Sequence, residues 1–353
     1  MNWQPTPLPY ASDLETKTIL KALNQAHRAL AELKGVARSI PRQDILINSL
    51  GMQEAKDSSE VENIVTTQDE LYRATLGLET NVSPETKEVR NYVAALKRGY
   101  DIVIKNQLLT SNHIIEIQSV LEENNAGLRR LPGTELRNQQ TGDVVYTPPQ
   151  EYDQIQNLMH NLERFINDRQ MSDLDPLVKM AVIHFQFESI HPFYDGNGRT
   201  GRIINILYLV LQKLIDLPIL YLSQYIIKNK SEYYRTLQAV RDKNDWENWL
   251  LFIILGIENT SLKTQIKVER IKNAMQQLKN ILRDNYKFYS QDLLNHLFQQ
   301  PYTKIEFVQE ALRVSRPTAA GYLNQLAEDQ VLIKKISKPN YYINPYLIKA
   351  LTD

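Results

Sequence analysis

The chain has 353 residues, with 41 basic residues balanced by 41 acidic ones and no cysteine. This length allows two or three domains with a substantial core, and the balanced charge creates no overall field that would attract nucleic acid or an acidic membrane. Disulfides, thiol nucleophiles and cysteine-ligated zinc are excluded. No signal peptide or membrane-length apolar run is recognised, so we expect a soluble cytoplasmic protein without a membrane partner.

Apolar periodicity predicts an almost entirely helical chain. Amphipathic spacing begins at residues 19–33 and 42–55, and helical spacing recurs at residues 84–105, 111–124, 151–167 and 228–241. Asp175 and Pro176 have the residue types of an N-cap and a first helical position, which predicts another helix from there. Residues 203–214 are apolar on nearly all sides, a pattern typical of a central helix buried in a bundle.

Residues 131–149 are the exception to the helical pattern. Gly133 and Gly142 are turn formers, residues 144–147 form a short β-type run, and Pro148 begins a double-proline stop. We therefore expect a short hairpin here.

A change in composition near residue 258 indicates a domain boundary. The long amphipathic helix expected over 262–282 either connects domains or pairs with a second chain, so a homodimer is left open. Beyond it, residues 286–353 show an order of helices and strands that resembles a winged helix. In that comparison, residues 315–328 take the recognition-helix position and residues 334–340 form the wing.

Winged helices often bind DNA, and four basic side chains of this region are suited to phosphate contacts: Arg316, Lys334, Lys335 and Lys338. The recognition helix offers few side chains for base edges beyond Asn324 and Gln325, and the local charge is only mildly basic. The sequence thus favours a role in protein interaction or dimerisation and leaves DNA binding open.

One run concentrates the residue types that nucleotide phosphate chemistry requires: His191, Pro192, Phe193, Tyr194, Asp195, Gly196, Asn197, Gly198, Arg199, Thr200, Gly201 and Arg202. Paired glycines let backbone N–H groups approach phosphate oxygens, and a helix beginning at Gly198 would direct its partial positive charge at the same anion. Arg199 and Arg202 then share one helix face. Asp195 is a hard oxygen donor suited to Mg²⁺.

This run resembles the signature of Fic-domain proteins, His-x-Phe-x-Asp/Glu-Gly-Asn-Gly-Arg-x-x-Arg, and matches every specified position. The resemblance implies a helical Fic core that uses ATP and Mg²⁺ to modify proteins. A Ser, Thr or Tyr hydroxyl attacks the α-phosphorus, AMP is transferred and pyrophosphate leaves. Relatives that transfer a terminal phosphate depart from the motif at its Gly/Arg positions, so the intact Arg202 favours nucleotidyl transfer.

The resemblance also implies a role for each position. His191 is the base and Asp195 the Mg²⁺ ligand, and an imidazole near its unperturbed pKa can accept a hydroxyl proton at neutral pH. Asn197 and the backbone around the two glycines hold the α-phosphate, while Arg199 and Arg202 take the β- and γ-phosphates, Arg202 acting as a second catalytic residue. The expected nucleotide contacts are Glu62, Asp195, Gly196, Asn197, Gly198, Arg199, Thr200, Gly201, Arg202, Tyr233 and Tyr234.

An inhibitory segment precedes the core. Residues 58–63 fit the pattern Ser/Thr-x-x-x-Glu-Gly/Asn found in many Fic proteins, with Ser58, Glu62 and Asn63 at its specified positions. The resemblance implies that Glu62 pairs with Arg202 and removes it from the γ-phosphate. The plainer interpretation is a capped, solvated, acidic helix start.

The resemblance also implies functions for two other segments. The hairpin is similar to the Fic flap, so a target segment is expected to dock on residues 142–149 by β-augmentation. Tyr233 and Tyr234 match a tyrosine pair near the adenine pocket, although a core role is left open.

We therefore expect a mainly α fold with four parts: an N-terminal helical region with the inhibitory motif (1–90), a Fic catalytic domain with a β-hairpin flap (91–258), a connecting helix (259–285) and a winged-helix-like domain (286–353). The expected function is autoinhibited protein adenylyltransfer to hydroxyl-bearing targets, including the chain itself. Two alternatives stay open, a hydrolase that removes AMP and a DNA-binding regulator with a Fic sensor core.

Overall fold

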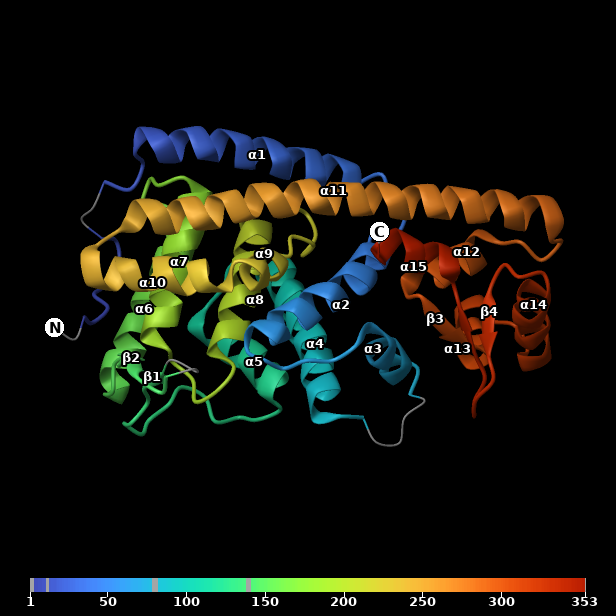
Figure 1. Ribbon diagram of the computed structural model, residues 1–353, viewed down its shortest axis with the longest axis horizontal. Helices are drawn as coiled ribbons and strands as arrows, with labels where there is room; N and C mark the ends of the chain where they lie inside the picture. The colour runs from blue at the N-terminus through green and yellow to red at the C-terminus, as the bar shows by residue number, and fades with distance from the viewer. Residues whose placement is uncertain (1–2, 11–12, 78–81, 138–140, 353) are drawn as a thin grey trace.

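The computed structural model describes residues 3–10, 13–77, 82–137 and 141–352, and it is mainly helical (Figure 1). Its N-terminal half contains α1 (Lys17–Ala37), α2 (Asp44–Val61), α3 (Gln68–Thr75), α4 (Pro84–Asn106), α5 (Ser111–Glu122), β1 (Leu136–Arg137), β2 (Val144–Tyr146) and α6 (Tyr152–Asn167). The middle contains α7 (Pro176–Ile190), α8 (Asn197–Leu211), α9 (Ser223–Lys228), α10 (Lys230–Lys243) and α11 (Trp246–Asn285). The C-terminal part contains α12 (Gln291–Gln299), β3 (Tyr302–Lys304), α13 (Ile305–Leu312), α14 (Arg316–Glu328), β4 (Ile333–Lys335), β5 (Tyr341–Ile343) and α15 (Pro345–Thr352).

The centre of the catalytic bundle is the pair α7 and α8. As predicted, α7 begins after Asp175, whose Oδ1 accepts a hydrogen bond from Leu177 N at 2.8 Å. Every residue of α7 after Pro176 is buried, and α8 is buried on nearly all sides, with α4 and α5 packed against it. The expected apolar helix is therefore present, although it ends at Leu211. This rigid pair positions residues 191–202, which comprise the connection between the two helices and the first turns of α8 and are called the 191–202 loop.

The helix α11 continues through residue 258, where the change in composition suggested a boundary. Before that residue most sides of α11 are buried in the core, whereas after it the buried positions follow a single stripe. The composition therefore changes near residue 258 because fewer faces of α11 are buried beyond it. The helix itself continues to Asn285. Figure 1 shows α1 lying along α11, with α15 against its other side.

The C-terminal part has the expected three helices and two strands, and it also has β3 and α15, which the sequence did not predict. Its antiparallel sheet has the strand order β3-β5-β4. The side chains proposed to face DNA are partly engaged inside this unit. The side-chain oxygen of Asn324 accepts from Lys334 Nζ at 2.7 Å and from Tyr342 Oη at 2.8 Å. Arg316 is paired with Glu306. These contacts leave fewer groups for base edges and phosphates than the sequence suggested.

The interpretation of residues 58–63 as a helix start is wrong, because this segment is the C-terminal end of α2. The helix runs to Val61 with Ser58 and Ser59 fully buried, and it ends where Asn63 takes a left-handed φ of 63°. The short helix α3, which apolar periodicity did not predict, follows after a capping box between Thr67 and Glu70.

The C-terminal unit contacts this same N-terminal region. Tyr302 Oη donates to Asp69 Oδ1 at 2.6 Å, and Lys304 Nζ donates to the carbonyl of Leu76 at 2.6 Å. Figure 1 shows α3 beside the strands of that unit. Within the described ranges, no helix is both long and apolar enough to cross a membrane.

Candidate active site

The loop between α7 and α8 is built from two left-handed residues. His191 ends α7 with φ 48° and ψ 60°, and Gly196 precedes α8 with φ 75°. A left-handed φ favours glycine, which explains the residue type at position 196. The helix begins at Asn197, one residue before the expected Gly198, and Asp195 Oδ1 accepts from Gly196 N at 2.7 Å.

Asn197 fixes this loop and does not point to a ligand. Its Oδ1 accepts from Phe193 N at 2.9 Å, and its Nδ2 donates to the Phe193 carbonyl at 2.8 Å. The side chain is buried. With both ends of the amide engaged, the side chain of Asn197 stabilises the turn in this structure, and its contact with a phosphate stays a prediction.

Arg202 lies in a closed set of contacts with the end of α2. Its Nη2 is 2.8 Å from Glu62 Oε1 and 2.9 Å from the carbonyl of Ser58, and its Nε donates to Ser58 Oγ at 2.8 Å. The arginine side chain is 2% exposed and the glutamate side chain 33%. Asn63 contacts Lys230 instead, with Nζ 3.1 Å from its Oδ1.

At the Glu62–Arg202 pair, the attraction between the two charges affects both pKa values more strongly than burial does. Burial alone would raise the pKa of Glu62, but the charge and hydrogen bond of Arg202 outweigh it and lower that pKa below its usual value. Burial likewise opposes the charge of Arg202, and Glu62 outweighs it, so the pKa of Arg202 is raised. Both groups are therefore ionised at neutral pH.

Arg199 is paired as well, with two carboxylates that sequence reasoning did not identify. Its Nη1 is 2.7 Å from Glu88 Oε2, and its Nη2 is 2.9 Å from Glu122 Oε1. Burial raises the pKa of Glu122, Arg199 opposes that rise, and Asp195 and Glu88 add to it. Glu88 lies inside α4 and Glu122 ends α5, and no short motif marks either position.

The carboxylates of Glu122 and Glu62 cover the two glycines of the loop. A methyl group added at Gly196 would collide with the carboxylate of Glu122, and one at Gly198 would collide with that of Glu62. Backbone at these glycines is where the resemblance directs a phosphate. The structure therefore has a negatively charged group against each of the two positions at which an anionic ligand is expected.

His191 has a less basic environment than the sequence suggested. Burial, followed by the positive charges of Arg129 and Arg241, lowers the pKa of His191 to about 4. The fully buried Arg129 positions the loop backbone, because its Nε donates to the His191 carbonyl and its N to the Pro192 carbonyl, both at 2.8 Å. The imidazole is thus neutral at pH 7, and its Nδ1 has no hydrogen-bond partner among the described residues.

Several expected nucleotide contacts lie elsewhere. Gly201 is packed against α7, where an added methyl group would meet Phe187 and Glu188, and Thr200 is fully buried. Tyr233 is buried and shares a hydrogen bond of 2.8 Å with His184 Nε2. It belongs to the core, which was the alternative left open. Tyr234 is 43% exposed, with its ring centroid 5.1 Å from that of Tyr233.

The donor set suits a cation held by few protein ligands. Asp195 is exposed beside Glu122, and among the described residues no group of three or more His, Cys, Asp or Glu side chains is arranged to hold a metal. Mg²⁺ commonly binds through one or two carboxylates and completes its shell with substrate phosphates and water. Asp195 fits that mode.

A short hairpin lies beside the loop. The strands β1 and β2 pair antiparallel, and Val144 and Val145 are largely exposed. Tyr146 anchors the hairpin, because its hydroxyl donates to the Ser189 carbonyl at 2.8 Å and Arg241 stacks on its ring at 3.9 Å.

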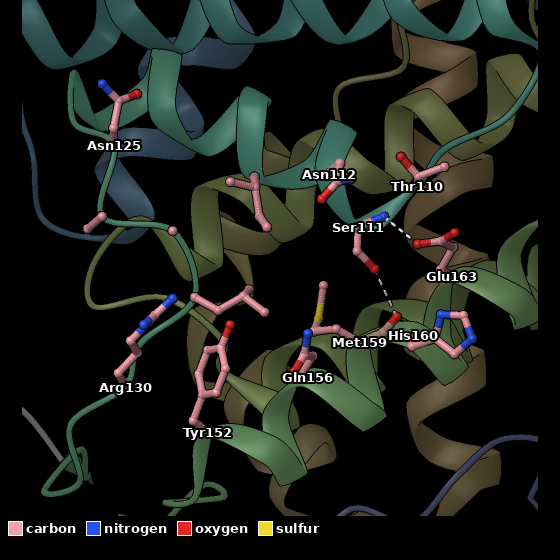
Figure 2. Close-up of a pocket in the computed structure, with 14 residues that line it drawn as sticks. Thr110, Ser111, Asn112, Asn125, Arg130, Tyr152, Gln156, Met159, His160 and Glu163 are labelled. Carbon is pink, nitrogen blue, oxygen red and sulfur yellow. Dashed lines mark hydrogen bonds between the residues drawn. The ribbon is translucent and has the colours of Figure 1, made fainter.

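A cavity of about 650 Å³ opens between the start of α5, the 125–130 loop and α6 (Figure 2). Ser111 on its wall donates from N to Glu163 at 2.8 Å and from Oγ to the Met159 carbonyl at 3.2 Å. Residues of the 191–202 loop do not line this cavity.

Three family models match successive parts of the chain. Residues 20–101 match the Fic/DOC family N-terminal model, residues 108–209 match the Fic/DOC family model, and residues 274–347 match the C-terminal domain of SoFic-like protein adenylyltransferases. The fold is also similar to that of a Fic family protein from Desulfovibrio desulfuricans, with a TM-score of 0.60, 21% identity, and coverage of 96% of this chain and 98% of that one. A Fic domain-containing signalling protein from Bacteroides thetaiotaomicron gives a TM-score of 0.55 and 18% identity over 70% of this chain and 95% of that one.

Among curated proteins, the chain is similar to those named protein adenylyltransferase Fic from Drosophila ananassae and Drosophila melanogaster. Each is 29% identical over 188 residues, a stretch equal to 52% of this chain and 36% of the relative. The chain thus aligns with little more than a third of the length of these relatives. The chain therefore contains a Fic/DOC N-terminal region, a Fic/DOC domain and a C-terminal region that matches the SoFic-like model.

Proposed function

We propose that this chain is a protein adenylyltransferase that transfers AMP from ATP to hydroxyl side chains, and that Glu62 holds it in an inhibited state. The observation that carries the proposal is the complete 191–202 motif whose last arginine is bound by Glu62 at 2.8 Å. The names of the curated relatives support the same reaction.

In the proposed reaction, a target hydroxyl attacks the α-phosphorus of ATP, and its proton passes to His191. The bond between the α-phosphorus and its bridging oxygen breaks, and pyrophosphate leaves. The low pKa of His191, about 4, keeps the imidazole unprotonated and ready to accept at neutral pH. Arg129 fixes the backbone of this residue, which supports its orientation toward the hydroxyl.

Arg199 and Arg202 would neutralise the charge that develops on the leaving pyrophosphate. Asp195 would hold Mg²⁺, which supplies further neutralisation of the phosphates when bound. In the inhibited state Arg202 is occupied by Glu62 and Ser58, so it is not available to a γ-phosphate. The target segment would pair with the exposed hairpin strand at residues 144–146.

Incubation of the chain with α-labelled or γ-labelled ATP in a cell lysate tests the reaction. We expect label on proteins, including the chain itself, from the α-position only. His191→Ala should abolish this labelling, and His160→Ala, which changes an exposed histidine outside the loop, should leave it intact. Label from the γ-position, or labelling by His191→Ala within about tenfold of the parent, would contradict the proposal.

A further inference from the structure

A second cleft lies between α2, α9, α11 and α15, and its lining includes Asp57 of α2, the residue before Ser58. It encloses about 440 Å³. Figure 1 shows α15 lying close to α2 and α11 at this place, and a hydrogen bond of 3.1 Å from Gln53 Nε2 to the Leu351 carbonyl joins α2 to α15. A volume of this size suits a small molecule.

Four cations converge on the cleft: Lys228, Lys263, Lys267 and Arg270. Three of them belong to α11 at spacings of four and three residues, so they occupy one face of that helix. Lys228 faces them from α9. Among the described residues, none of these four cations forms an ion pair, which means that none lies within 4.0 Å of a carboxylate oxygen.

The lining contains one carboxylate, that of Asp57 on α2. Burial raises the pKa of Asp57 to about 6, while nearby lysines oppose the rise. The pKa of Lys267 is lowered, first by burial and then further by Lys228, Arg270 and Lys263, while Asp57 opposes the shift. These mutual effects mean that the cations are close enough to repel one another. Even with Asp57 ionised, the cleft keeps an excess of three positive charges.

The remaining lining residues complement a phosphate-bearing molecule. Lys267 Nζ donates to Gln53 Oε1 at 2.6 Å, which fixes its side chain inside the cleft. Deeper in, a small adjoining cavity is lined by the buried Tyr221, whose hydroxyl has no hydrogen-bond partner among the described residues. Ile266, which is 49% exposed, adds an apolar wall.

From this arrangement we propose that the cleft between α2 and α11 binds a small molecule carrying two or more phosphate groups. Four cations that form no ion pair among the described residues supply donors for two phosphates. Charge-assisted hydrogen bonds to phosphate are among the stronger polar contacts in proteins. Convergence of the cations in one cleft, instead of their spread along a face, favours a compact ligand over the backbone of a nucleic acid. The site is separate from the 191–202 loop and does not depend on the proposed reaction.

The test is calorimetric titration of the full chain with inorganic pyrophosphate, in the absence of ATP and metal. We expect saturable binding that weakens at least about tenfold in Lys263→Gln/Lys267→Gln, because two charge-assisted contacts are lost. The matched control, Lys272→Gln/Arg283→Gln, removes two charges from the same helix outside the cleft and should bind like the parent. Because Lys267 also contacts Gln53, the second variant Lys228→Gln/Lys263→Gln tests the cleft without disturbing that bond.

Unchanged affinity in both cleft variants would overturn the proposal, since pyrophosphate would then be bound elsewhere, for example at Arg199 and Arg202. Equal affinity for orthophosphate would overturn the requirement for two phosphates. Titration with ADP identifies the source of the phosphates. If ADP binds more tightly than pyrophosphate and the same variants lose this binding, the ligand is a nucleotide. If ADP and pyrophosphate bind with equal affinity, the ligand is inorganic. Binding of random duplex DNA that these variants abolish, without pyrophosphate binding, would contradict a small-molecule site.

Discussion

The ends of α2 and α5 place a glutamate against the same loop, but they hold it in different ways. Glu62, after α2, pairs with Arg202, which is also bound by the side chain and carbonyl of Ser58 from the same helix end. Glu122, at the end of α5, pairs with Arg199, which it shares with Glu88 from another helix.

The electrostatic difference follows from this geometry. At α2 one carboxylate meets one arginine, and the pKa of Glu62 is lowered. At α5, burial raises the pKa of Glu122, Arg199 opposes that rise, and Asp195 and Glu88 add to it. Removing one partner of a buried exclusive pair leaves an uncompensated charge, whereas a shared arginine keeps a second partner. The Glu62 contact should therefore control ligand binding more strongly than the Glu122 contact.

The largest expected effect comes from Glu62→Gly. This change frees Arg202 to bind a γ-phosphate and removes the carboxylate at Gly198, so transfer of AMP should rise at least about tenfold. The measurement is the initial rate of self-modification with α-labelled ATP. In Glu62→Gly/Arg202→Ala the rate should fall again, because the freed arginine is absent, and this non-additivity is expected for groups in direct contact.

Glu60→Gly provides the control for Glu62→Gly. It is two residues away on the same helix, and its carboxylate contacts Lys56, 3.1 Å away, instead of the loop. It introduces the same glycine without touching Arg202. Equal activation by both variants would contradict inhibition through the Glu62–Arg202 pair, because a general loosening of the end of α2 would then explain the activation.

A smaller effect is expected from Glu122→Gln in the Glu62→Gly background. The amide keeps the shape of the side chain but removes the negative charge at Gly196, and Arg199 stays paired with Glu88. The affinity for ATP should increase roughly threefold, which is typical of a partly screened charge effect. Equilibrium binding of ATP measures it.

Glu88→Gln is the matched comparison, because Glu88 binds the same arginine but does not cover a glycine of the loop. Its effect on ATP affinity should be smaller than that of Glu122→Gln. If the two variants change the affinity equally, the position of Glu122 over Gly196 has no importance and only the charge of Arg199 matters.

The sequence carried enough information for the fold class and for the loop, but not for its surroundings. The N-cap at Asp175, the buried α8 and the hairpin follow from local patterns of residue type, and the structure contains all three. Glu122, Glu88 and Arg129 reach the loop only through tertiary packing of α4, α5 and the 123–130 connection. A local pattern contains no signal for such contacts.

Two features of the site could not be predicted, for the same physical reason. The sequence leaves open whether Tyr233 lies near a nucleotide or in the core, and it suggests an unperturbed pKa for His191, because burial is not visible in a single sequence. The structure buries Tyr233 against His184 and surrounds His191 with two arginines. Motifs identify residue types at fixed spacing, whereas burial and charge depend on elements distant in the chain.

The prediction that bears least directly on ligand binding concerns how α2 itself is held, and it appears as a dependence of stability on pH. Burial raises the pKa of Glu54 to about 8, opposed by a hydrogen bond from Ser223, so the folded chain keeps this carboxyl protonated up to that pH. In the unfolded chain it ionises near its ordinary pKa of 4.5, so its stabilising contribution declines as pH rises from 4.5 to 8. Between pH 6 and 8 the free energy of unfolding of the parent should lose about 1 kcal/mol per pH unit from this group.

Glu54→Gln keeps hydrogen-bonding groups toward Ser223 and Tyr92 without a titratable proton. Urea unfolding at pH 6, 7 and 8 should therefore show the variant gaining stability relative to the parent as pH rises, while Glu60→Gln follows the parent. Because α5 contains no fully buried carboxyl among its described residues, this dependence distinguishes the support of the Glu62 contact from that of the Glu122 contact. Parallel pH profiles for the parent and Glu54→Gln would mean that Glu54 is already ionised in the folded chain, and that the α2 end is held by Arg202 and Ser58 alone.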